Sequence, residues 1–280
     1  IRSFLLRGRE LGFRAGAFGK FWQSVEGEQA LLTLDMFRGT RPVFALDLPG
    51  FGFSERSQRH YTAGFYTRAI VEFLEREVGE PSDVIALSLS GEFAAMAAQQ
   101  RPELFETLTL ISPSGLTAEG KKKGSQSAKA TGKSDLLHAL LSFPLWSQAL
   151  YDLLTTRKSI ESFLGMSFVG DTPRDLVEYA YATTHQAGAR HAPLSFVSGR
   201  LFTPDIRERV YEKLELPVLV IFDQDPYVDF EMLPNLVDNL PNWNMARIEP
   251  TRGLPHWETP QATVMALEAF WNVLSPTNNE

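Results

Sequence analysis

Three residues that are far apart in the chain have side chains that could together perform nucleophilic catalysis. Ser88 lies in Ala-Leu-Ser-Leu-Ser-Gly at residues 86–91, Asp225 follows an apolar run, and His256 lies in a loop that contains glycine and proline. A histidine can accept the proton of a serine hydroxyl when a carboxylate holds the imidazole in the correct tautomer. These residue types could together form a Ser–His–Asp triad, in which the serine acts as a nucleophile.

Ser88 lies where an apolar run, 83–87, meets a helical pattern that begins at Gly91. A sharp turn at this junction would lift the hydroxyl off a sheet, and the helix would direct N–H groups toward developing negative charge. The motif is degenerate, because Ala86 and Ser90 stand where G-x-S-x-G has glycines. Small residues at such a turn are as readily explained by packing, so this motif indicates a nucleophile only together with the other two residues.

Two aspartates follow the apolar run at 217–222. Catalytic groups gather just past the carboxyl ends of strands in open α/β sheets. Asp225, which precedes a proline, is the better candidate and Asp223 is the reserve. An acid that caps the turn or the next helix would account for one of them. The remaining histidines lack the spacing of a zinc site: His60, His138, His185 and His191.

The elements that must position these residues follow an alternating pattern. Short apolar runs at 30–34, 43–47, 83–87, 108–111 and 218–222 are typical of strands buried on both faces of a parallel sheet. Helical spacing at 61–78, 91–100 and 265–274 predicts helices that cover this sheet. Residues 10–25 suggest a β-hairpin or meander. The pattern predicts an α/β fold with a mostly parallel central sheet flanked by helices.

One long segment interrupts the alternation. Residues 120–134 contain five lysines and no apolar side chain larger than alanine, which predicts a flexible basic surface loop. From residue 136 the pattern becomes helical with an apolar side. We therefore expect a core formed by residues 1–115 and 215–280, with a helical cap inserted at 116–214.

Composition excludes several classes of function. The net charge of −7 argues against nucleic-acid binding, and the absence of cysteine excludes disulfides and thiolate chemistry. No apolar run could cross a bilayer and no secretory signal is visible, so we expect a soluble, cytoplasmic protein without stable membrane insertion. The plastid stroma is the alternative if the source is a photosynthetic eukaryote. No metal, nucleotide or flavin motif is visible, so no cofactor is expected.

Three further motifs carry a family resemblance. Asp-Leu-Pro-Gly-Phe-Gly-Phe-Ser at 47–54 is similar to the D-x-P-G-x-G-x-S turn of the α/β-hydrolase superfamily. Arg-Pro-Glu at 101–103 and His-Trp-Glu-Thr-Pro at 256–260 resemble two more of its segments. Together with the order Ser, Asp, His, these motifs resemble its cap-containing, serine-nucleophile members. The Ser-Leu-Ser elbow resembles a poorly characterised subgroup from bacteria and photosynthetic organisms.

The resemblance implies a role for each residue. Ser88 would be the nucleophile, His256 the general base and then acid, and Asp225 the carboxylate that orients the imidazole. The Leu89 amide would supply half of the oxyanion hole. The apolar cap implies a hydrophobic small-molecule substrate, for which the sequence offers five contact residues: Leu87, Phe143, Trp146, Phe163 and Trp257.

The second half of the oxyanion hole has no candidate. Relatives place an H-G-type loop and a helix between the strands that match 30–34 and 43–47, but here only residues 35–42 intervene. A crossover between parallel strands takes about 10–12 residues or more. We therefore expect that residues are missing near Leu34–Asp35, which a Cα separation of about 3.8 Å would refute.

These observations predict hydrolysis of an ester or related acyl bond. A serine at the nucleophile position argues against epoxide hydrolase and haloalkane dehalogenase chemistry, in which the matching residue is an aspartate. Two alternatives stay open. The degenerate elbow and the short interval favour a non-catalytic binding protein of the same fold. A cofactor-free oxygenase or haloperoxidase-like enzyme is the other.

Overall fold

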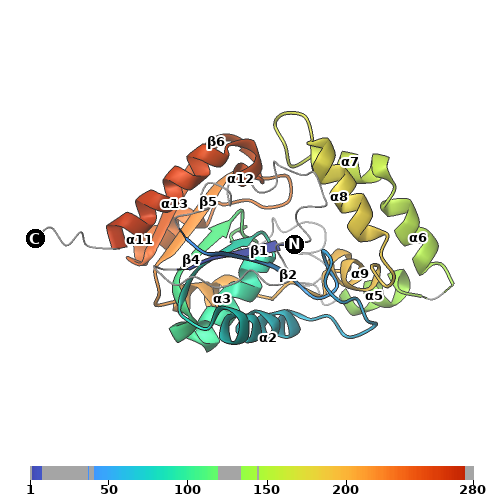
Figure 1. Ribbon diagram of the computed structural model, residues 1–280, viewed down its shortest axis with the longest axis horizontal. Coiled ribbons are helices and arrows are strands. Elements are labelled where there is room, and N and C mark those ends of the chain that lie inside the picture. The colour runs from blue at the N-terminus through green and yellow to red at the C-terminus, as the bar shows by residue number, and fades with distance from the viewer. Residues whose placement is uncertain (1, 8–36, 38–40, 119–133, 144, 275–280) are drawn as a thin grey trace, which may run out of the picture.

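The computed structural model describes residues 2–7, 37, 41–118, 134–143 and 145–274 (Figure 1). Six strands form one sheet in the order β2-β1-β3-β4-β5-β6. The strands are β1 Arg2–Arg7, β2 Val43–Asp47, β3 Ser82–Leu87, β4 Phe105–Ile111, β5 Val218–Gln224 and β6 Trp243–Arg252. Strands β3 to β6 are parallel, whereas β1 pairs antiparallel with both β2 and β3. The predicted α/β fold with a mostly parallel sheet is confirmed.

The parallel strands are buried on both faces, which explains their continuous apolar sequences. In β5, Val218 and Val220 join one buried cluster, and the alternate residues Leu219 and Ile221 join the other. This alternation follows from the two-residue period of a strand. The two clusters form the layers between the sheet and its helices.

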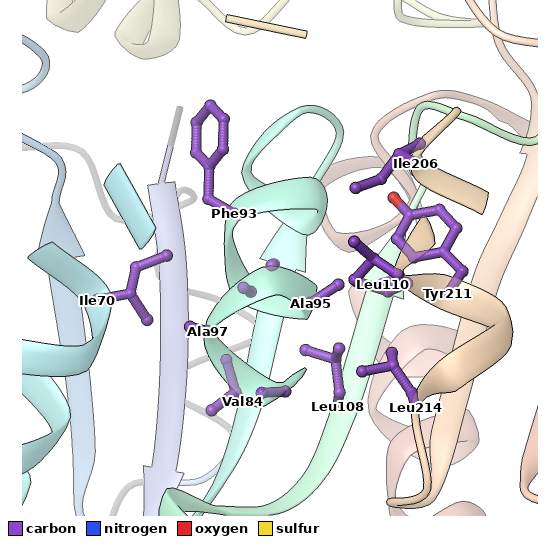
Figure 2. Close-up of a cluster of buried hydrophobic side chains, with 14 of the residues drawn as sticks. Ile70, Val84, Phe93, Ala95, Ala97, Leu108, Leu110, Ile206, Tyr211 and Leu214 are labelled. Atoms are coloured by element: carbon purple, nitrogen blue, oxygen red, sulfur yellow. The ribbon is translucent and has the colours of Figure 1, made fainter. Parts of the chain in front are cut away.

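Helices α2 (Ala63–Phe73) and α3 (Ser90–Gln100) pack over one face of the sheet, and α13 (Pro260–Leu274) packs over the other. Figure 2 shows Phe93, Ala95 and Ala97 of α3 with Val84 of β3 and Leu108 of β4. The small alanine side chains allow α3 to approach the sheet closely. The helix behind Ser88 is thereby held firmly on the sheet.

Four shorter helical elements lie between the strands and the larger helices of the core in the chain. They are the π-helical turn η1 (Leu74–Val78), the 3₁₀ turn η2 (Pro102–Leu104), α11 (Leu233–Asn239) and α12 (Pro255–Glu258). None of the described helices is long and apolar enough to span a lipid bilayer.

Between β4 and β5 the chain forms a run of short helices, and Figure 1 shows those within residues 134–197 grouped to one side of the sheet. They are α5 (Ser134–Leu141), α6 (Ser147–Leu154), α7 (Arg157–Gly165), α8 (Arg174–Thr184), α9 (His191–Val197), α10 (Ile206–Arg209) and η3 (Tyr211–Lys213). A Cβ on Gly50 of the early glycine turn would lie 2.5 Å from Cβ of Ala192 in α9. We call α5 to α9 the cap; its exact division from the core at 116 and 214 stays a prediction.

The structure contains two strands that the sequence pattern did not predict. In β6 most side chains are exposed or half-buried, as expected of an edge strand covered on one face, so it lacks an apolar run. The pairing of β1 between β2 and β3 is non-local, and residue spacing alone does not specify it. The predicted elements at 10–25 and 30–34, the Leu34–Asp35 junction and nearly all of the 120–134 loop lie outside the described residues.

Candidate active site

Ser88 occupies a strained turn between β3 and α3. Its φ is 52°, in the left-handed region that residues other than glycine rarely adopt. The Ser88 amide donates to the Ile111 carbonyl of β4 at 2.8 Å, which ties the turn to the neighbouring strand. Leu89 forms the N-cap of α3, where the first N–H groups lack acceptors within the helix. The geometry is that of a nucleophile elbow.

The Ser90 side chain explains how the turn tolerates a serine at the position where G-x-S-x-G has its second glycine. Its hydroxyl donates to the Leu87 carbonyl at 2.7 Å and accepts from the Leu87 amide at 3.0 Å. The Ser90 side chain is fully buried, as is that of Ala86 on the other side of Ser88. The degenerate motif is therefore compatible with a tight turn, because the extra hydroxyl closes it.

The structure distinguishes the two candidate aspartates. Asp223 is buried, pairs with Arg247 Nε of β6 at 2.9 Å and accepts from the Thr251 amide at 2.9 Å. These contacts occupy both of its oxygens in holding β6 to β5. Asp225 instead accepts from the Tyr227 and Val228 amides, in both cases through Oδ1. Asp225 therefore lacks the strand-to-strand contacts of Asp223, and its role in catalysis stays a prediction.

His256 lies in α12, directly after β6, and is buried. Helix α12 contacts both β5 and β6 (Figure 1). Gly253 precedes it with φ of 101°, and a Cβ at this position would lie 2.8 Å from Oδ2 of Asp225. The loop that carries His256 therefore packs directly on the Asp225 carboxylate.

All three residues follow carboxyl ends of parallel strands. Ser88 follows β3, Asp225 follows β5, and His256 follows β6, with β4 between the first two. Neighbouring strands are about 4.8 Å apart, so the ends of β3 and β5 are separated by roughly 10 Å. His256 follows β6, on the far side of β5 from Ser88, so the three residues share one edge of the sheet, and their assembly into a triad stays a prediction.

Burial shifts the pKa of both titratable groups. Desolvation lowers the pKa of His256 to about 4, which favours the neutral imidazole that a general base requires. Desolvation raises the pKa of Asp225 to about 6, against the opposing effect of hydrogen bonds from the Tyr227 and Val228 amides. At neutral pH the imidazole is therefore neutral and the carboxylate is mostly ionised.

Glu258 links the histidine loop to the cap. Its Oε1 accepts from the Val169 amide, after α7, at 2.6 Å, and its Oε2 accepts from the Arg252 amide at 2.7 Å. Sequence analysis identified Glu258 only as part of a family motif. Its sequence position gave no sign of the contact with Val169, because the two residues are 89 positions apart.

The five predicted substrate contacts fall into two groups. Leu87 and Trp257 are half-buried beside the elbow and the histidine, respectively. On the cap, Phe143, Trp146 and Phe163 are exposed, and the rings of the first two lie 4.5 Å apart. Their role in substrate binding stays a prediction.

Comparison with known proteins identifies the family. The model of the family described as "Alpha/beta hydrolase family" matches residues 11–267. The chain belongs to this family. One curated relative, the uncharacterized hydrolase YugF of Bacillus subtilis, is 32% identical over 83 residues, which cover 29% of this chain and 30% of that protein. The match thus spans under a third of that relative's length.

Several solved structures of other proteins share the fold of this alpha/beta hydrolase at low sequence identity. A meta-cleavage product hydrolase from Pseudomonas fluorescens has a TM-score of 0.66 and 13% identity, covering 89% of this chain and 86% of its own. A malate-bound esterase from Thermogutta terrifontis has a TM-score of 0.64 and 14% identity, covering 88% and 85%. At these identities the similarity establishes the fold and leaves the substrate open.

Proposed function

We propose that this alpha/beta hydrolase is a serine hydrolase that cleaves an ester or related acyl bond of a hydrophobic small molecule. In this proposal Ser88 is the nucleophile, His256 is the general base and acid, and Asp225 orients the imidazole. No cofactor takes part in the reaction.

The backbone of Ser88 is the observation that carries the proposal. A serine with φ of 52° between a strand and a helix is strained by about 1–2 kcal/mol. A turn with only a structural role would be better served by glycine, which adopts this conformation without a steric penalty. Retention of a strained serine is expected where its hydroxyl must project from the sheet edge.

The reaction would proceed in two halves. Ser88 Oγ attacks the substrate carbonyl while His256 accepts the hydroxyl proton, and the Leu89 amide stabilises the resulting oxyanion. His256 then protonates the leaving alcohol, which leaves an acyl-serine. A water molecule, deprotonated by His256, attacks this acyl group and releases the acid, which restores the Ser88 hydroxyl.

Two observations support an acyl substrate with apolar character. The cap exposes aromatic side chains, including Phe143 and Phe163. Among the structural neighbours, the Thermogutta terrifontis protein is described as an esterase, and another is described as a serine hydrolase involved in carbazole degradation. Both neighbours have the fold of this chain.

A screen of p-nitrophenyl esters of graded chain length tests the proposal. We expect turnover by the wild type and a loss of at least about 10³-fold in kcat for Ser88→Ala. Ser57→Ala, in an exposed loop, is the matched control and should retain activity. Equal rates for wild type and Ser88→Ala with every ester would overturn the proposal.

A further inference from the structure

Arg56 lies at the junction of the core and the cap, two residues after the glycine turn. The cap packs directly on its backbone, since a Cβ at Gly188, between α8 and α9, would lie 2.3 Å from the Arg56 carbonyl oxygen. Phe53, three residues before Arg56, contacts Tyr179 of α8 with ring centroids 5.8 Å apart. The cap therefore covers part of Arg56, which is half-buried.

One edge of the Arg56 guanidinium is buried without a hydrogen-bond acceptor. Nη1 donates to the Ser54 carbonyl at 3.2 Å. Nε and Nη2 are shielded from solvent and have no hydrogen-bond partner among the described residues. These two nitrogens direct parallel N–H groups from one side of the guanidinium, the geometry that pairs with both oxygens of a carboxylate.

Asp47, at the end of β2, is the nearby acid that acts electrostatically on Arg56. Asp47 Oδ2 accepts from the Phe53 amide at 3.0 Å and so supports the glycine turn. Burial dominates over this charge, because desolvation lowers the pKa of Arg56. Because Nε and Nη2 have no acceptor among the described residues, this edge of the guanidinium is open to a further anion.

Tyr151 of α6 presents a second unused donor beside Arg56. Its side chain is 4% exposed, and its hydroxyl has no hydrogen-bond partner within the described part of the chain. The hydroxyl and the guanidinium are close enough to interact electrostatically. Burial raises the pKa of Tyr151 to about 12, so the hydroxyl remains a donor at neutral pH. Buried donors without acceptors are rare in folded proteins and call for a functional explanation.

We propose that Arg56 and Tyr151 bind a carboxylate group of the substrate, so that the enzyme acts on acyl compounds that carry a free carboxylate remote from the scissile bond. This inference rests on the proposed hydrolase function. The turn that carries Arg56 follows β2, and Ser88 follows β3, with β1 between them. At about 4.8 Å per strand, the ends of β2 and β3 are roughly 10 Å apart, and Arg56 lies nine residues beyond the end of β2 at Asp47.

Binding can be tested without turnover. Thermal unfolding of the wild type should shift upward with octanoate and much less with octanamide, which has the same chain without the charge. We expect the octanoate affinity to fall about 10- to 100-fold in Arg56→Gln, as for loss of a charged, bidentate hydrogen bond. Arg59→Gln is the matched control, since Arg59 pairs with Glu55 on the exposed side of the same loop.

Tyr151→Phe separates ligand binding from a structural role. The hydroxyl has no hydrogen-bond partner among the described residues, so its removal should leave the thermal unfolding midpoint of the ligand-free protein unchanged. The same substitution should weaken octanoate binding. Equal stabilisation by octanoate and octanamide would overturn the inference. So would stabilisation by inorganic phosphate alone, or undiminished octanoate binding by Arg56→Gln.

Kinetics distinguish this inference from the hydrolase function. The ratio of kcat/KM for a p-nitrophenyl hemiester of a dicarboxylic acid to that for the neutral ester of equal length should exceed one. In Arg56→Gln this ratio should fall by about 10- to 100-fold. Hydrolysis that favours neutral esters would refute the carboxylate site and retain the hydrolase. Octanoate binding without any turnover would refute the hydrolase and retain the site.

Discussion

Replacing Ser88 by glycine should separate the strain of the elbow from its chemistry. With φ of 52°, any residue that has a Cβ is held at a cost of about 1–2 kcal/mol. Glycine avoids that cost but loses about 0.5–1 kcal/mol through the greater freedom of its unfolded chain. We therefore expect Ser88→Gly to exceed Ser88→Ala in unfolding free energy by about 0.5–1 kcal/mol. Both variants should lack esterase activity.

Thermal or urea unfolding of the two variants measures this difference, which corresponds to about 1–3 °C in Tm for a chain of this size. Ser159 in the helix α7 provides the matched control, because glycine is there less stable than alanine by up to about 1 kcal/mol. The sign of the Gly-minus-Ala difference should thus reverse between the two sites. If Ser88→Ala is as stable as Ser88→Gly or more stable, the argument from backbone strain is refuted.

Three further predictions concern the other side of the site. Gly253→Ala should lower the free energy of unfolding by roughly 1–3 kcal/mol and also lower kcat, because a side chain at this positive φ is strained and its Cβ would displace Asp225. Calorimetry and esterase assays measure the two effects. An unchanged Tm would contradict this prediction. The pKa of Asp225 is raised to about 6, so its ionisation destabilises the fold as pH rises from 4 to 6. The difference in unfolding free energy between Asp225→Asn and the wild type should therefore be about 1–3 kcal/mol more favourable to the variant at pH 8 than at pH 4. The wild-type kcat/KM should decline below about pH 6. A stability difference that does not change with pH would contradict the raised pKa. Glu258→Gln should speed hydrogen exchange at the Val169 amide by about 10-fold, because it replaces a charged acceptor, whereas the exposed Glu161→Gln should not.

Residue spacing predicts those parts of the fold whose burial leaves a periodic mark. The strands β2, β3, β4 and β5 and the helices α2, α3 and α13 were predicted because apolar runs or helical stripes report their covered faces. The strands β1 and β6 were not, since the first pairs with distant segments and the second has an exposed face. Pairing partners and edge positions are properties of the folded sheet that no local pattern records.

The same limit applies within the site. Asp223 and Asp225 both follow a strand, and sequence ranked them only by the proline after Asp225; the contact of Asp223 with Arg247 favours the same choice. The sequence does not single out Arg56, because an arginine in a polar loop is normally solvated and the burial of its Nε and Nη2 depends on how the cap packs. Residue types and order suggest a catalytic chemistry, which stays a prediction, whereas they carry no sign of which side chains the fold removes from solvent.

Covalent labelling by a fluorophosphonate probe tests the central claim most directly. We predict a single modified peptide that contains Ser88 in the wild type, strongly reduced labelling in His256→Ala, and no labelling in Ser88→Ala. Modification of Ser88→Ala to the same extent as the wild type would contradict the account.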